Sequence, residues 1–188
     1  KIILESMPQG VTIGANYKCN ANCTFCLGGN YKPFNFKVYK NYFEPRLGSI
    51  IKEADYVSFC GMGELLMAPD IKDFLKYVNA TLPDNNKILT TNGLALKNTL
   101  ADIFIDSKYS IQISLHASNA GLHEQITGLK GGFDKIIEQV RFIIARRKNA
   151  QSPYVTLVFV ATTMNIEDLP NFVELAASLG VDSIQVNY

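Results

Sequence analysis

Six short runs rich in β-branched residues alternate with longer amphipathic stretches, and this alternation restricts the fold of the chain more than any other feature. The runs lie at residues 11–17, 56–60, 87–91, 109–116, 154–160 and 183–186. Their apolar character is typical of strands that are covered on both faces. Apolar residues recur at helical spacing over residues 70–80, 133–148 and 167–180, and Pro45 is expected to start or split a helix within residues 36–54.

A strand followed by a helix about six times over predicts right-handed crossovers and a parallel sheet. Six units are too few to close an eight-stranded barrel. The sequence therefore predicts an α/β fold, either an open curved sheet or a partial (β/α)6 barrel that is TIM-barrel-like, with residues 1–188 in one domain. No helical pattern follows the sixth run and the first residue is not Met, so we expect the chain to be part of a longer protein.

The composition argues against several classes of protein. Hydrophobic residues make up 47% of the chain and charged residues 19%, and the net charge is +1, which is typical of a soluble globular domain. A nucleic-acid partner is not expected, because the densest basic run, Arg146 to Lys148, lies near the end of a helical pattern, where the helix dipole favours positive charge. No run can span a membrane and no signal peptide is recognisable, so we expect a cytoplasmic protein.

Three of the four cysteines, Cys19, Cys23 and Cys26, stand within eight residues, directly after the first predicted strand. Such clusters are more often metal ligands than a disulfide framework in a chain of this kind. A structural zinc site needs a fourth ligand, for which Cys60 and the two histidines of the chain are candidates. A cubane iron–sulfur cluster held by three cysteines instead leaves one iron free for a substrate or cofactor. Spacing alone leaves both interpretations open.

Polar or glycine-containing segments follow four of the predicted strands. They are CGMGELL at residues 60–66, TTNG at 90–93, SLHA at 114–117 and TTMN at 162–165. Binding groups in parallel α/β sheets gather at the C-terminal ends of the strands. We therefore expect these segments and the cysteines to lie together on one rim of the sheet.

With these motifs, the sequence resembles the radical S-adenosylmethionine (radical SAM) enzymes through nearly the whole chain. CNANCTFC, residues 19–26, matches the CxxxCxΦC motif of that family, with Phe25 at the aromatic position. GMGELL is similar to the glycine-rich motif after the second strand, and TNG and SLHA resemble segments after the third and fourth strands. Residues 123–140 look like the region after strand four in the branch that includes peptide-modifying enzymes, many of which carry cysteine-rich C-terminal extensions.

The resemblance implies a 4Fe–4S cluster held by Cys19, Cys23 and Cys26, with the amine and carboxylate of SAM on its open iron. One electron from the cluster would cleave the sulfonium and release methionine and a 5′-deoxyadenosyl radical, which abstracts hydrogen from a substrate. A peptide or protein is the first expectation for that substrate, and a small metabolite or nucleotide sugar is the alternative. An electron donor such as flavodoxin or ferredoxin is implied as a partner. A second class of function, a non-catalytic zinc-binding module that adds Cys60 to the three cysteines, stays open.

The resemblance further implies which residues contact SAM. They are Gly61, Met62, Gly63 and Glu64 at the methionine amine, Phe25 near the adenine, Thr91, Asn92 and Ser114 at the carboxylate or ribose, His116 at the ribose or substrate, and Thr163 and Val186 at the adenosine. Glu64 is expected either to pair with the amine or to hold its loop. Asn165 is expected to cap the following helix, Lys130 to balance the carboxylate, and Cys60 to be a buried thiol.

Overall fold

The computed structural model describes residues 6–15, 18–28, 34–83, 86–96, 98–105, 107–147 and 152–188. The last two residues of the first predicted strand, 16 and 17, and the last residue of the predicted helix at 133–148 lie outside the described residues. Among the described helices, none is long and apolar enough to cross a membrane.

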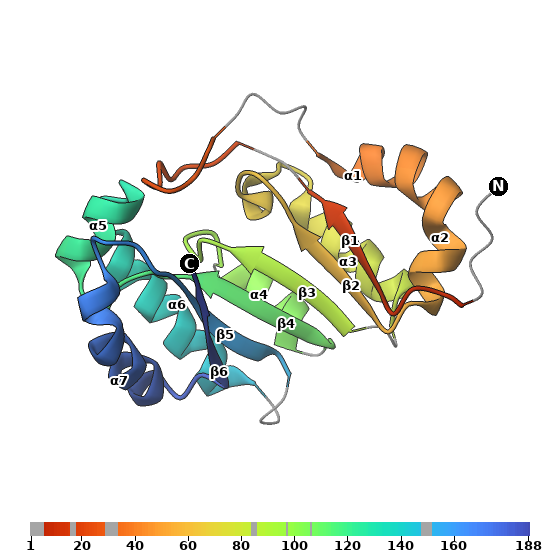
Figure 1. Cartoon of the computed structure of the whole chain (residues 1–188). Coiled ribbons are helices and arrows are strands. Elements are labelled where there is room, and N and C mark those ends of the chain that lie inside the picture. The colour runs from red at the N-terminus through yellow and green to blue at the C-terminus, as the bar shows by residue number, and fades with distance from the viewer. Residues whose placement is uncertain are drawn as a thin grey trace.

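Six strands form a single parallel sheet in which the order along the sheet equals the order along the chain. They are β1 (Gly10–Gly14), β2 (Tyr56–Cys60), β3 (Asn86–Thr91), β4 (Tyr109–Ser114), β5 (Tyr154–Val160) and β6 (Ser183–Asn187). The hydrogen bonding between neighbours runs from β1 to β6 without closing into a ring, so the sheet is open and curved (Figure 1). This arrangement confirms the prediction of a partial barrel built from successive β-α units.

The helical segments lie between successive strands. They are α1 (Phe36–Val38), η1 (Tyr39–Phe43), α2 (Glu44–Glu53), η2 (Leu65–Met67), α3 (Ile71–Thr81), α4 (Asn98–Ile105), α5 (Ala120–Thr127), α6 (Gly132–Arg146), η3 (Ile166–Asp168) and α7 (Leu169–Leu179). Pro45 stands in the first turn of α2, directly after η1, so it divides the continuous helical run from Phe36 to Glu53 and does not start a separate helix. Gly180 ends α7 in the left-handed conformation, as expected for a helix C-cap.

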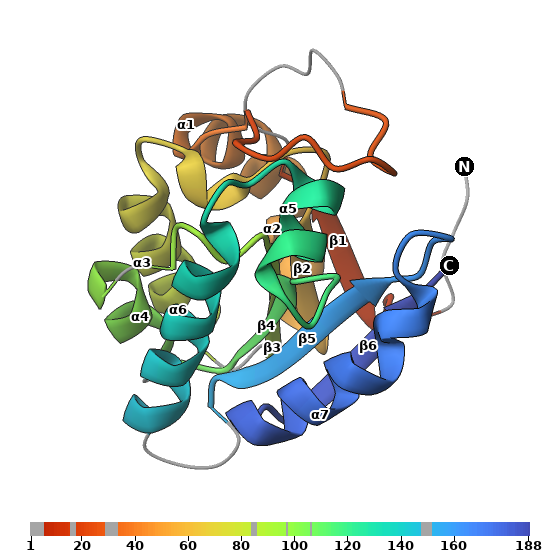
Figure 2. The same ribbon diagram turned by 90° about the vertical axis from the view of Figure 1, so that its left-hand side faces the viewer.

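The core lies between the sheet and the helices on its outer side (Figure 2). Phe59 of β2 packs edge-on against Phe74 of α3, with ring centroids 5.3 Å apart, and Phe159 of β5 packs against Phe172 of α7 at 4.9 Å. Because side chains alternate along a strand, these contacts identify the outward-facing residues of each strand. The residues between them face the inner, concave side of the sheet.

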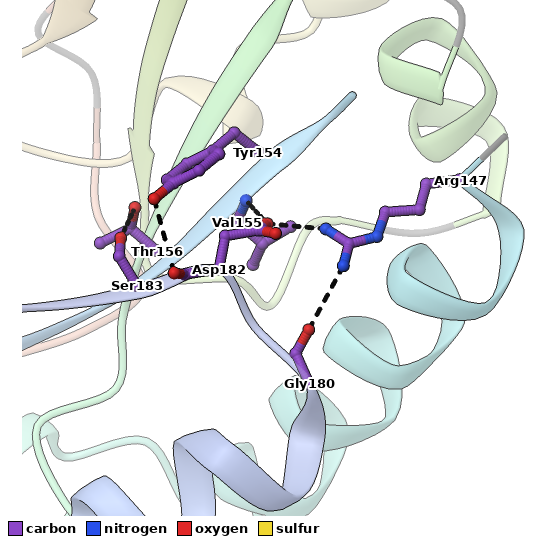
Figure 3. Close-up of polar contacts among 7 residues, drawn as sticks. All are labelled: Arg147, Tyr154, Val155, Thr156, Gly180, Asp182 and Ser183. Carbon is purple, nitrogen blue, oxygen red and sulfur yellow. Dashed lines mark hydrogen bonds and ion pairs between the residues drawn. The ribbon is translucent and has the colours of Figure 1, made fainter. Parts of the chain in front are cut away.

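A polar network joins β5 and β6 where these strands begin, at the end of the sheet away from the rim motifs (Figure 3). Asp182 accepts from the guanidinium of Arg147 at 2.7 Å and from the backbone N–H of Val155 at 2.8 Å. The side chains of Arg147 and Asp182 are each only 13% exposed, so the pair is well shielded from water. The network therefore ties the end of α6 to the last two strands.

Candidate functional site

A cavity of about 310 Å³ opens at the C-terminal ends of the strands. Its lining contains the three motif cysteines and most of the residues expected to contact SAM, namely Phe25, Gly61, Met62, Gly63, Glu64, Thr91, Asn92, Ser114 and His116. These residues come from four loops that are far apart in the sequence. The structure thus brings the cysteine motif, GMGE, TTN and SLH segments to one place, as the rim argument predicts.

The cysteine loop packs on the C-terminal end of α5. Figure 1 shows this loop (red to orange) extending away from β1 toward α5. The backbone N–H of Asn22 donates to the carbonyl of Thr127 at 2.8 Å, and that of Thr24 donates to the carbonyl of Ile126 at 2.9 Å. Carbonyls in the last turn of a helix have no partner within it, so they are available to hold another segment. Gly128 lies directly against Asn22 in the left-handed conformation. The residues on both sides of Cys23 are therefore held by α5.

The thiol of Cys23 holds its proton more tightly than an ordinary cysteine. Burial, together with the nearby negative charges of Cys19 and Cys26, raises the pKa of Cys23 to about 11. In this conformation no three His, Cys, Asp or Glu side chains of the described part of the chain are arranged to hold a single metal ion. Cysteines that hold a cubane cluster bind three different irons and therefore stand farther apart than the ligands of one ion. Three thiols along one cavity fit a cluster better than a zinc ion.

Glu64 is the centre of the polar contacts behind the cavity. Its carboxylate is 2% exposed and accepts from the hydroxyl of Thr91 at 2.9 Å and from the backbone N–H groups of Leu66 at 3.0 Å and Asn92 at 2.6 Å. Burial raises the pKa of Glu64, while these donors lower it. Of the two roles expected for Glu64, these contacts favour holding the loop.

Asn92 extends this network to the cysteine loop. Its side-chain amide donates to Oδ1 of Asn20 at 2.7 Å and lies 3.8 Å from Sγ of Cys19, and its own Oδ1 accepts from the backbone N–H of Leu94. The contact to Cys19 is long even for sulfur, so the bond to Asn20 is the stronger one. The GMGE loop, the turn after β3 and the cysteine loop are thereby connected through two side chains.

His116 occupies an unusual backbone conformation beside the cavity. The predicted fourth strand, at residues 109–116, ends earlier, at Ser114, and His116 has a φ of 62°. Its ring Nδ1 accepts from the backbone N–H of Val160 at 3.1 Å, which places the ring proton on Nε2. Burial, and next the charge of His123, lowers its pKa to about 4, so the imidazole is neutral at physiological pH. The ring packs edge-on against Phe25, with centroids 4.9 Å apart.

Asn165 does not cap the following helix with its side chain, contrary to the prediction. It is buried, accepts from the N–H and hydroxyl of Thr162, and donates to the carbonyls of His116 and Val160, each at 2.9 Å. The amide pairs with four polar groups at once, and this outweighs a single cap. Asn165 thus joins the ends of β4 and β5 and supports the left-handed conformation of His116.

Sequence reasoning did not identify Asp168, which has a similar role. Its carboxylate accepts from the backbone N–H of Ser118 at 2.6 Å and from the Ser118 hydroxyl at 2.5 Å. These contacts fasten the loop after β4 to the start of α7. Fifty residues separate the partners, so no local pattern signals the pair.

Two residues expected near the adenosine do not line the cavity. Thr163 is exposed in the loop after β5, where the neighbouring Thr162 makes the hydrogen bonds to Asn165 instead. Val186 stands opposite Phe159 in the register of β5 and β6 and therefore on the outward-facing side, 42% exposed. The strand period of two decides this outcome, because a shift of one residue moves a side chain to the other face.

The remaining candidates also stand apart from the cavity. Lys130 is exposed and Cys60, at the end of β2, is half-buried, and neither is part of the cavity lining. His123 is fully buried in α5, where its ring packs against Phe133. A fourth protein ligand from Cys60 or His123 is therefore not placed beside the three cysteines.

Comparison with known proteins identifies the family. The family model described as the radical SAM superfamily matches residues 15–176. The chain is 27% identical over 180 residues to a probable GTP 3′,8-cyclase of Saccharolobus islandicus, an alignment that covers 95% of this chain and 56% of the relative. A probable GTP 3′,8-cyclase of Metallosphaera sedula is 23% identical over 183 residues, with 95% of this chain and 55% of the relative covered. The chain thus spans about half the length of these relatives.

Solved structures share the fold. SuiB of Streptococcus suis, bound to S-adenosylmethionine, superposes with a TM-score of 0.78 at 20% identity, covering 97% of this chain and 41% of that chain. SuiB bound to precursor peptide SuiA matches equally well, with a TM-score of 0.78 at 21% identity, covering 97% of this chain and 40% of that chain. The match of the family model to most of the chain, together with a partial parallel barrel that gathers the cysteine motif and the strand-end loops at one cavity, shows that this chain belongs to the radical SAM superfamily.

Proposed function

We propose that the chain is the catalytic core of an enzyme that cleaves SAM reductively at a 4Fe–4S cluster and uses the resulting radical to abstract hydrogen from a substrate. The observation that carries the proposal is the shared cavity, in which Cys19, Cys23 and Cys26 face the GMGE segment and the polar ends of β3 and β4. Four thiols would complete a structural zinc site, whereas three thiols on a cubane cluster would leave one iron free to bind SAM.

Cys19, Cys23 and Cys26 would hold the cluster, and binding to iron would offset the raised pKa of Cys23. When bound, the cluster supplies one electron to the sulfonium of SAM, whose C–S bond breaks to give methionine and a 5′-deoxyadenosyl radical. Hydrogen transfer from a substrate C–H bond to that radical gives 5′-deoxyadenosine and a substrate radical.

The protein residues bind and orient SAM in this proposal. Gly61 and Gly63 allow close approach of the backbone to the methionine amine, and Gly63 has a positive φ of 116° that favours glycine. Glu64 keeps the loop in place from behind. The neutral His116 offers its Nε2–H as a donor to the ribose or substrate, and Phe25 covers one side of the imidazole and shields the cavity from water.

A peptide or protein is the first candidate for the substrate, supported by the likeness of the fold to SuiB, whose structure with a precursor peptide is known. A nucleotide is the second candidate, because relatives in sequence carry the name of a GTP 3′,8-cyclase. We further propose a cytoplasmic location and a flavodoxin or ferredoxin as electron donor, since the reaction consumes an electron.

The test is anaerobic reconstitution of the full-length protein with iron and sulfide, followed by incubation with SAM and dithionite. We expect at least about four irons and four sulfides per chain, the content of one cubane cluster, and formation of 5′-deoxyadenosine. Cys23→Ala should lose about four irons per chain and the formation of 5′-deoxyadenosine, and Cys60→Ala, as the matched control outside the cavity, should retain both. A colourless protein that retains zinc under these conditions, or a Cys23→Ala variant with full SAM cleavage, would contradict the proposal.

A further inference from the structure

The concave face of the sheet carries a second set of polar side chains, below the cavity of the cysteines. Alternate residues of each strand face this side, starting from Gly10, Tyr56, Asn86, Ser110, Tyr154 and Ser183 in β1 to β6. The pairing of neighbouring strands places the residues of this inward-facing set next to one another across the sheet. The residues between them, among them Phe59 and Phe159, face the other side of the sheet and pack against the outer helices.

Four of the inward-facing residues form a hydrogen-bonded row, which we call the amide row: Thr90, Gln112, Gln185 and Asn187. Thr90 Oγ1 donates to Gln112 Oε1 at 3.0 Å, Gln112 Nε2 donates to Gln185 Oε1 at 3.4 Å, and Gln185 Nε2 donates to Asn187 Oδ1 at 3.1 Å. Thr90 also lines the cysteine cavity, so the row begins at that cavity and crosses the sheet to β6. Thr156 and Ser183 pair below it at 2.8 Å (Figure 3).

The inward-facing positions of the six described strands contain no Asp, Glu, Lys, Arg or His. Among the described residues of the cavity lining, Lys18 is the one lysine or arginine, and it belongs to the cysteine loop at the rim. The partners that proteins commonly use for a triphosphate are arginine, lysine and the N-terminus of a helix. A highly charged anion would lose its hydration on this face without gaining positively charged partners.

Side-chain amides provide donors and acceptors in one planar group, which matches the N–H and C=O of a peptide bond. The side chains of Gln185 and Asn187 are exposed, and the 3.4 Å contact between Gln112 and Gln185 is weak. A ligand that offers its own amides can therefore replace the contacts within the row at little cost. An uncharged peptide segment has this chemistry and adds no charge, whereas a nucleoside triphosphate adds several negative charges that this face does not pair.

Resting on the proposed function, we propose that the amide row is the substrate-binding surface of this protein and that it takes an uncharged segment of a peptide. The segment lies across β4 to β6 with its backbone amides on Gln112 and Gln185, so that its reacting C–H bond reaches the cavity beside Thr90. The neutral face rejects nucleotides because it supplies no positive charge for their phosphates.

The test uses the full-length protein with its cluster and SAM bound, and two probes. In the first arm, a display library of short random peptides is selected on the immobilised protein, and enriched sequences are synthesised with a fluorescent label. In the second arm, GTP at millimolar concentration is tested by equilibrium dialysis. We expect enriched peptides with a net charge near zero, no retention of GTP, and affinity for the labelled peptides that falls at least about tenfold in Gln112→Glu, which introduces an unpaired charge.

Gln125→Glu on the exposed surface of α5 is the matched control and should bind as the wild type does. A library without binders, enrichment of strongly charged peptides, retention of GTP, or unchanged peptide binding by Gln112→Glu would each overturn the inference. Formation of 5′-deoxyadenosine is measured in parallel without peptide. Failure of that reaction together with intact peptide binding would refute the proposed function and leave the binding surface standing.

Discussion

Replacing Glu64 with Gln tests whether one buried carboxylate holds the GMGE loop against the turn after β3. The two oxygens accept three hydrogen bonds, from Leu66, Thr91 and Asn92. Gln keeps one carbonyl oxygen for Leu66 and Thr91 but turns an NH₂ group toward the N–H of Asn92. The variant therefore loses the shortest of the bonds, 2.6 Å long, and leaves a half-buried N–H facing another donor.

The magnitude follows from these contacts. A hydrogen bond to a charged group contributes about 1.5–3 kcal/mol, and an unsatisfied buried donor costs about 1–3 kcal/mol. Gln offsets part of this loss, because burial of the carboxylate is itself unfavourable and raises the pKa of Glu64. We expect a net loss of about 2 kcal/mol in the free energy of unfolding at neutral pH, equal to about 4–8 °C in melting temperature for a chain of this size.

The assay is urea unfolding followed by far-ultraviolet circular dichroism, with an unchanged m value as the check that the same surface is exposed on unfolding. Glu138→Gln on the exposed face of α6 is the control and should stay within about 0.5 kcal/mol of the wild type. Because burial raises the pKa of Glu64 and Gln does not ionise, the wild type alone should gain stability as the pH falls through the folded-state pKa of Glu64. The difference in the free energy of unfolding between wild type and Glu64→Gln should therefore narrow as the pH rises. A gap below about 0.5 kcal/mol at every pH would refute the reasoning.

Three further predictions concern other parts of the structure. Burial lowers the pKa of His116 to about 4, so the wild type should lose up to about 3 kcal/mol in the free energy of unfolding as the pH falls from about 6.5 toward 4, whereas His116→Asn should not. The same pH dependence of the free energy of unfolding in both proteins, measured by urea unfolding, would contradict this prediction. Gly128→Val should reduce the iron bound after reconstitution, and Gly131→Val should not. Both glycines have a positive φ, 69° and 58°, but of the two only Gly128 lies against the cysteine loop. Equal iron contents in the two variants would contradict the role of α5 in holding the cysteine loop. Asp182→Asn should lower the free energy of unfolding by about 2 kcal/mol, measured by urea unfolding, because Arg147 then loses its shielded partner; an unchanged value would show that the pair contributes nothing.

Much of the fold was predictable from the sequence, because its signals are local. Short β-branched runs and helical spacing depend on residues within a few positions of one another, and their repetition leaves few topologies for the sheet. Gly180 marked a helix end and Pro45 the change from η1 to α2 for the same reason, since each acts through its own backbone. The end of β4 was misplaced because the β-like run continues through Leu115 to His116, and only contacts with β5 and Asn165 turn that backbone into the left-handed region.

The cysteine motif and the glycine-rich segment likewise identified the site from the sequence alone, because the chemistry of thiols and the freedom of glycine belong to the residues themselves. What only the tertiary structure decided is how distant segments support that site: the loop-holding role of Glu64, the link from Asn165 to His116, and the seat of the cysteine loop on α5. It also decided that Val186 faces away from the cavity and Gln185 toward the concave face. Each of these depends on a partner many residues away and on the register of a strand, where a single step reverses the side chain, and neither is encoded in a local pattern.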